Sequence, residues 1–107
     1  MSDESEGYCA TFHRAVELVG KRWNGVILDA LLGGAERFGQ IRAAVPGLSD
    51  RLLTERLHQL EHEGLVSRRC PEPNGVPRYV LTQKGSELGP VIEALSDWGV
   101  KWVSVPD

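Results

Sequence analysis

The sequence is poor in cysteine and contains no long apolar run. Its two cysteines, Cys9 and Cys70, are too few for the disulfide framework of a small secreted domain. No apolar stretch approaches the roughly 18 residues that cross a bilayer. Residues 1–7 are acidic and polar, unlike a signal peptide. We therefore expect one cytoplasmic domain without a membrane segment, since 107 residues suit a single hydrophobic core.

The sequence also lacks the local motifs of common enzymes. It has no nucleophile elbow, phosphate-binding loop, zinc-protease pair or paired-carboxylate arrangement. Cys9 with His13, and His58 with His62, have the spacing of two ligands on one helix face, but a third ligand is not evident. We expect no enzymatic activity, no metal and no cofactor.

An overall basic excess is absent as well, because the net charge is −3. The charge is unevenly distributed, however. Residues 37–84 carry eight basic and five acidic side chains, whereas residues 1–36 and 85–107 each have an acidic excess of three. This distribution is expected of a protein that contacts DNA with its middle and a second copy of itself with its ends.

Hydrophobic spacing and turn signals predict the order of elements. Four helices are expected first, over residues 10–19, 22–32, 37–45 and 50–63, with Ser49 as the N-cap of the fourth. Two strands at 65–70 and 78–82 then flank a turn at 71–77, and a last helix runs over 83–102, bent or restarted at Pro90.

This order is that of a winged helix–turn–helix. We predict an α+β fold, mainly helical, with a two-stranded β-hairpin wing. Residues 1–8 form a flexible acidic N-terminus and residues 9–107 a single domain. Within that domain, residues 10–20 and 86–103 are expected to be dimerisation helices.

The fourth predicted helix has the composition of a base-reading helix. Its leucines share one face, and Arg51, Thr54, Glu55 and His58 lie on the opposite arc. Arg can fork onto guanine, Thr can meet a thymine methyl, and Glu can accept from cytosine. The predicted DNA contacts, from the third and fourth helices and the hairpin, are Arg37, Gln40, Ser49, Arg51, Thr54, Glu55, His58, Arg68, Asn74 and Arg78.

The terminal helices carry more apolar surface than one small domain needs. We predict that two copies bury it between them, with an interface that comprises Phe12, Val16, Leu88, Ile92, Leu95, Trp98 and Trp102.

Several motifs together resemble the HxlR family of bacterial regulators. They include residues 18–23 (Leu-Val-Gly-Lys-Arg-Trp), 53–57 (Leu-Thr-Glu-Arg-Leu), 63–66 (Glu-Gly-Leu-Val) and 79–82 (Tyr-Val-Leu-Thr), and the likeness extends from Cys9 to Trp102. Within the family, residues 20–25 are most similar to the YodB-type repressors, which respond to quinones, diamide and related electrophiles. Two departures are that Ala10 replaces the usual proline and that no cysteine follows Cys70.

The resemblance implies that Cys9 senses oxidants or electrophiles. The residues alone favour a structural cysteine, because Asp3, Glu4 and Glu6 oppose the thiolate that a helix N-terminus and His13 would favour.

Cys70 is expected to be buried in the strand. The implied function is a homodimeric repressor, bound to an inverted-repeat operator and controlled by oxidation or alkylation of Cys9. A noncovalent ligand or a metal as effector, and a winged helix that binds proteins, remain alternatives.

Overall fold

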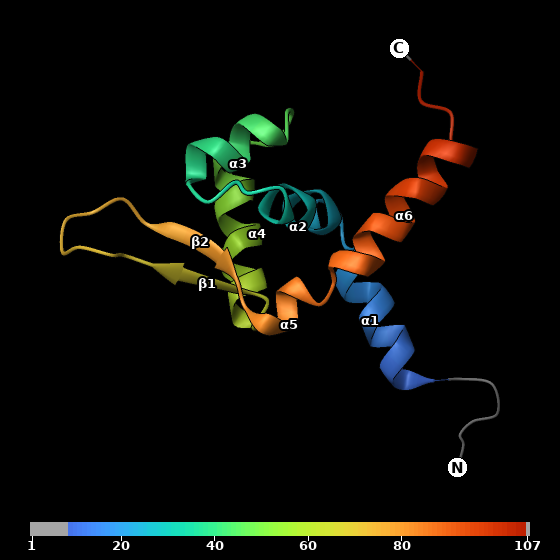
Figure 1. Ribbon diagram of the computed structural model, residues 1–107, viewed down its shortest axis with the longest axis horizontal. Helices are drawn as coiled ribbons and strands as arrows, with labels where there is room; N and C mark the ends of the chain where they lie inside the picture. The colour runs from blue at the N-terminus through green and yellow to red at the C-terminus, as the bar shows by residue number, and fades with distance from the viewer. Residues whose placement is uncertain (1–8, 107) are drawn as a thin grey trace.

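A computed structural model describes residues 9–106, and these residues form six helices and one two-stranded sheet (Figure 1). The elements in chain order are α1 (Ala10–Gly20), α2 (Asn24–Leu32), α3 (Phe38–Ala44), α4 (Asp50–His62), β1 (Val66–Arg69), β2 (Arg78–Leu81), α5 (Gln83–Ser86) and α6 (Gly89–Trp102). This is the predicted mainly helical α+β fold with a β-hairpin. The predicted flexible segment, residues 1–8, lies outside the described residues.

The core lies between α2, α3, α4 and the hairpin. Leu53, Leu57 and Leu60 of α4 are fully buried, as their helical spacing predicts. They belong to one cluster with Ile27 of α2 and Ile41 of α3. Burial of this leucine face fixes which side of α4 remains exposed to solvent.

A short turn sets the angle between α3 and α4. Gly47 takes a φ of +91°, a left-handed conformation that favours glycine. Ser49 caps α4, because its hydroxyl oxygen accepts from the Leu52 N–H at 3.1 Å. The Arg42 guanidinium lies 2.9 Å from an Asp50 carboxylate oxygen and so links the two helices. The predicted cap at Ser49 is confirmed.

The strand β2 of the hairpin is held by the chain that precedes α3. β1 and β2 are antiparallel, with Val66 opposite Leu81 and Arg69 opposite Arg78. The Tyr79 N–H donates to the Glu36 carbonyl at 2.8 Å, which joins β2 to the α2–α3 connection. The loop of residues 70–77 therefore extends from an anchored strand as the predicted wing (Figure 1).

One predicted helix boundary is wrong, and the predicted restart of the last helix near Pro90 is confirmed. The second helix begins at Asn24 rather than at residue 22, because Trp23 has a φ of +76° that ends any helical run before it. The predicted last helix restarts near Pro90, because residues 83–102 comprise two helices, α5 and α6. Pro90 has no N–H to donate to the Ser86 carbonyl, so the helical hydrogen-bond ladder is interrupted there.

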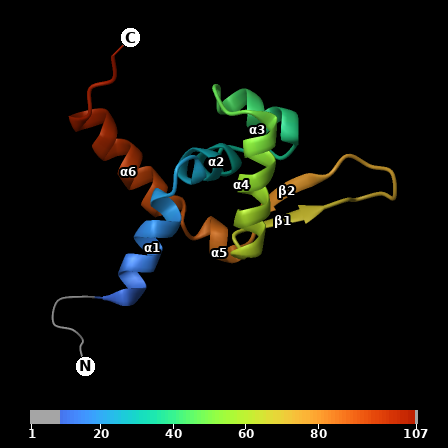
Figure 2. The same cartoon turned by 180° about the vertical axis from the view of Figure 1, so that it is seen from behind.

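Helices α1 and α6 extend from one side of the molecule, and the wing extends from the opposite side (Figures 1 and 2). Helix α1 has no buried residue, and α6 buries Ile92 alone. The two terminal helices therefore keep most of their apolar side chains outside the core.

Candidate nucleic-acid interface

The face of α4 opposite the leucines presents the predicted base-reading side chains. Arg51, Thr54, Glu55 and His58 are all exposed. The Thr54 hydroxyl donates to the Asp50 carbonyl at 2.9 Å, so its methyl group is the part left for a base edge. Figure 2 shows α4 in front of the body, beside α3 and the hairpin, where a duplex could approach it.

Arg51 and Glu55 form a solvent-exposed pair on this face. Arg51 Nε lies 3.5 Å from Glu55 Oε2, one helical turn away, and the Arg51 side chain is 91% exposed. Such an exposed pair is weak in water. Little free energy is therefore needed to separate Arg51 from Glu55, and the guanidinium can turn to another acceptor.

The predicted contacts on α3 and its turn also have structural roles. Gln40 Oε1 accepts from the backbone N–H groups of Glu36 and Arg37, both at 3.0 Å, and so caps α3. Its amide nitrogen, the Arg37 side chain and the Ser49 hydroxyl hydrogen are the groups left as donors to phosphate. Arg37, Gln40 and Ser49 are exposed, in agreement with a backbone-contacting role.

The predicted DNA contacts on the hairpin are all exposed, but one of them also contacts an acidic side chain. Arg68 and Asn74 are exposed, Arg68 on β1 and Asn74 in the wing loop. Arg78, at the loop end of β2, is also exposed, but its guanidinium lies 3.7 Å from the Glu36 carboxylate. Sequence reasoning missed the role of Glu36, which precedes α3 and reaches Arg78 only through the tertiary fold.

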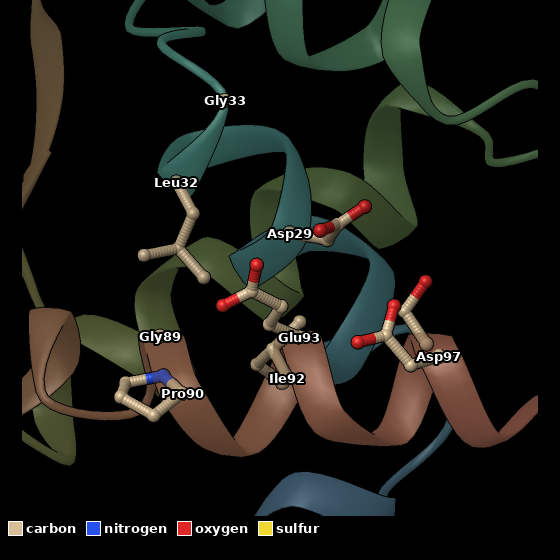
Figure 3. A pocket seen from close by; sticks show the side chains of 9 residues that line it. Asp29, Leu32, Gly33, Gly89, Pro90, Ile92, Glu93 and Asp97 are labelled. Atoms are coloured by element: carbon tan, nitrogen blue, oxygen red, sulfur yellow. The ribbon is translucent and has the colours of Figure 1, made fainter.

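The cleft between α2 and α6 has the wrong charge for DNA. Its volume is about 610 Å³, and Asp29, Glu93 and Asp97 line it. Figure 3 shows the Glu93 and Asp97 side chains rising from α6 toward α2. Among residues 9–106 these carboxylates do not form a group able to hold a metal ion. Their charge repels phosphates, so this cleft is a poor surface for DNA.

Cys9 stands at the N-cap of α1, as its position in the sequence predicts. Its Sγ accepts from the Phe12 N–H at 3.4 Å, and the residue is exposed. One turn along, His13 Nε2 lies 3.5 Å from Glu17 Oε2. The thiol is therefore accessible to a small reagent and lies against the positive end of a helix.

Cys70 is exposed, so the prediction that it is buried is wrong. β1 ends at Arg69, and Cys70 is the first residue of the wing loop rather than part of the strand. Both cysteines are thus open to solvent. Cys9 is the N-cap of a helix, whereas Cys70 lies in the wing loop.

The predicted dimer-interface residues fall into two groups. Phe12, Val16, Leu95, Trp98 and Trp102 are exposed, with Phe12 at 68% and Trp98 at 57%. Ile92 is only 6% exposed and Leu88 packs partly buried against the core, so these two contribute to the single chain. The assignment of Ile92 to the interface is therefore corrected: helix α6 turns this side chain toward α2.

A helix–turn–helix with an exposed polar recognition face and an adjacent β-hairpin defines a DNA-binding winged helix protein. Residues 18–107 match the HxlR-like helix-turn-helix family, and the chain belongs to that family. It is a transcriptional regulator and not an enzyme. No helix among the described residues is long and apolar enough to cross a membrane.

Two regulators of Bacillus subtilis are similar over most of their length. The HTH-type regulator YvaP is 44% identical over 89% of this chain and 89% of its own, and YodB is 38% identical over 84% of this chain and 81% of its own. The solved structure of reduced YodB is 36% identical with a TM-score of 0.78, covering 94% of this chain and 99% of that one.

YodB from the same organism has also been solved in two treated forms. The diamide-treated form has a TM-score of 0.73 at 35% identity, and it covers 94% of this chain and 100% of that one. The quinone-bound form has a TM-score of 0.74 at 36% identity, covering 88% and 100%.

Proposed function

We propose that this regulator is a homodimeric repressor that binds an inverted-repeat operator and releases it when Cys9 is oxidised or alkylated. The observation that carries the proposal is the exposed Cys9 thiol at the start of α1, a helix whose apolar side chains are themselves uncovered. We also infer a cytoplasmic location, because the proposed target is chromosomal DNA.

The DNA-bound state uses α4 in the major groove and the wing beside it. Arg51, Thr54, Glu55 and His58 meet base edges, and the donors on α3, with Ser49, hold phosphates. Arg68 and Asn74 of the hairpin follow the backbone next to the groove, with Arg78 at the loop end of β2. Phosphate neutralisation by the cations makes the affinity fall as the salt concentration rises.

The dimer forms through α1 and α6. Phe12, Val16, Leu95, Trp98 and Trp102 supply apolar area that a single chain leaves in water. Because the wing projects from the opposite side, two copies joined at these helices keep both α4 faces available (Figure 1). The operator is then an inverted repeat whose half-site centres lie about 34 Å apart, or a multiple of that distance.

Two reactions of Cys9 follow from its accessibility. With a quinone, the thiolate adds to a ring carbon, a C–S bond forms, and the ring takes up a proton to become a substituted hydroquinone. With diamide, two thiols lose two electrons and two protons to the N=N bond, and a disulfide forms. We expect S-alkylation in the first case and a Cys9–Cys9′ bond between subunits in the second; a Cys9–Cys70′ bond is the less favoured pairing.

Release of DNA follows from geometry. Cys9 begins the helix that we assign to the dimer interface, so an adduct or a crosslink there changes how the subunits sit against each other. The two α4 helices are rigidly built into their own cores and move with their subunits. A shift of a few ångströms then takes one recognition helix out of its half-site while each wing stays unchanged.

Selection of operators from random duplexes by the reduced full-length chain, followed by anisotropy titration, tests this function. We expect an inverted repeat, a negative slope of log affinity against log salt, and loss of binding after treatment with benzoquinone or diamide. Selected sites without two-fold symmetry would contradict the dimer. Unchanged affinity after both treatments would contradict the sensing role.

A further inference from the structure

A second cleft lies where α1 meets the C-terminal end of α4. Its volume is about 440 Å³, and it is lined by side chains from α1, α2, α4 and α5 together with Lys21, which follows α1. The proposed function makes no use of it. The cleft touches both the helix assigned to dimerisation and the helix assigned to DNA, so an occupant would contact both.

Three cations line this cleft: Arg14, Lys21 and Lys84. Lys21 Nζ donates to Gln59 Oε1 at 3.0 Å, and Lys84 Nζ donates to the Glu63 carbonyl at 2.7 Å. Both acceptors are uncharged oxygen atoms. Each ammonium has three N–H groups and therefore keeps donors for a further acceptor.

The two carboxylates at the cleft form no ion pair with these lysines among residues 9–106. Glu17 and Glu63 line it, and the carboxylate of Glu17 lies 3.5 Å from His13. Among residues 9–106 neither Lys21 nor Lys84 is within ion-pair distance of a carboxylate. The cleft thus offers partly unused positive charge to an anion.

Asn24 adds a buried acceptor without a partner. The residue lines the cleft, yet it is only 1% exposed. Its Nδ2 donates to the Leu18 carbonyl at 2.8 Å, which fixes the amide so that Oδ1 is the free atom. That oxygen is buried and has no hydrogen-bond partner within the part of the chain that the structure describes. Buried polar atoms are rarely left unpaired, so a hydrogen-bond donor from a ligand would satisfy Oδ1.

We infer that this cleft binds a small organic anion that also carries an O–H or N–H donor, such as a hydroxycarboxylate. Its carboxylate is held by Lys21, Lys84 and Arg14, and its donor reaches Asn24 Oδ1. Such a ligand bridges α1 and α4 and gives the regulator a noncovalent effector site that does not depend on the thiol of Cys9.

Calorimetric titration of the full chain carrying Cys9→Ser tests binding apart from thiol chemistry and apart from DNA. The probes are two hydroxycarboxylates of different length, lactate and 4-hydroxybenzoate, each compared with the acid that lacks the hydroxyl, propionate or benzoate. We expect at least one hydroxy acid to bind about tenfold more tightly than its matched acid, because it alone satisfies Asn24 Oδ1.

Substitutions then locate the site. Lys21→Gln is expected to weaken binding of that hydroxy acid by about tenfold, because a charge-assisted hydrogen bond is lost. Arg14→Gln, on the exposed surface of α1, repeats the test with little risk to folding. Arg22→Gln is the matched control, since its guanidinium stacks 5.3 Å from the Trp23 ring and does not line the cleft.

Two results would overturn the inference. One is that neither hydroxy acid binds more tightly than its matched acid at millimolar concentration. The other is that Lys21→Gln and Arg14→Gln bind as the parent does, or that Arg22→Gln loses as much affinity as they do.

Discussion

At the scale of single residues, the base contact proposed for Arg51 can be tested directly. Arg51 is exposed, and among residues 9–106 its one ion pair is the 3.5 Å contact to Glu55. We predict that Arg51→Ala weakens specific operator binding by about 1–3 kcal/mol, the value of a bidentate contact to guanine. Anisotropy titration against the selected operator measures it. Arg22→Ala, which removes a cation outside the interface, is the control, and equal losses in both variants would refute the base contact.

Ser49 caps α4 in addition to its proposed contact with a DNA phosphate, and a substitution tests the cap. Its hydroxyl oxygen caps α4 through the Leu52 N–H. Ser49→Ala is predicted to lower the free energy of unfolding by about 1 kcal/mol, since one N-terminal donor of the recognition helix loses its acceptor. Denaturant unfolding measures this loss. Ser49→Asp keeps an acceptor and should restore most of the stability; if it fails to do so, the cap is not the cause.

At the scale of elements, the close approach of α5 to Leu65, the residue before β1, depends on Gly85. A Cβ at this buried position would overlap the Leu65 carbonyl, whose oxygen accepts from the Thr82 N–H at 3.0 Å. We predict that Gly85→Ala destabilises the fold by about 1–3 kcal/mol through overpacking. The measurement is the midpoint of thermal or urea unfolding.

Gly39 provides the matched control for that change. It lies within α3, and a Cβ there meets nothing within 4 Å. Gly39→Ala is expected to leave stability unchanged or raise it by up to about 1 kcal/mol, because alanine favours a helix. Similar losses at both glycines would show that the Leu65 contact is not what Gly85 avoids.

The elements themselves were predictable from the sequence because their signals are local. The leucine spacing of α4, the Ser49 cap and the turn before it all appear within a few residues. The break before α6 was signalled by Pro90, but the start of α2 was not, because the left-handed backbone at Trp23 is set by packing. An apolar pattern in the sequence likewise does not show which neighbour covers a side chain. The pattern of the last helix therefore predicts that a partner covers Ile92, whereas the same chain buries it.

The candidate site was predictable to the extent that it lies on one helix. The exposed arc of α4 follows directly from the buried arc. The contact between Glu36 and Arg78, the exposure of Cys70 and the cleft around Asn24 join segments distant in sequence. No local pattern predicts such contacts.

At the scale of the whole molecule, the proposed dimer rests on the uncovered apolar side chains of α1 and α6. We predict that Trp98→Asp converts the dimer to a monomer at micromolar concentration, because a charge replaces a large apolar side chain in the interface. Sedimentation velocity measures the state. Val26→Asp, which changes an exposed valine of α2, should remain dimeric. A parent chain that sediments as a monomer would refute the assembly.

The most direct test of the central claim compares Cys9→Ser with Cys70→Ser. Both cysteines are exposed, and serine at position 9 keeps an acceptor for the Phe12 N–H, so the fold of α1 is preserved. The measurement is operator affinity of the parent and both variants before and after diamide or benzoquinone. The account predicts that the parent and Cys70→Ser release the operator on treatment and that Cys9→Ser stays bound. Release by Cys9→Ser, or retention by the parent, would contradict it.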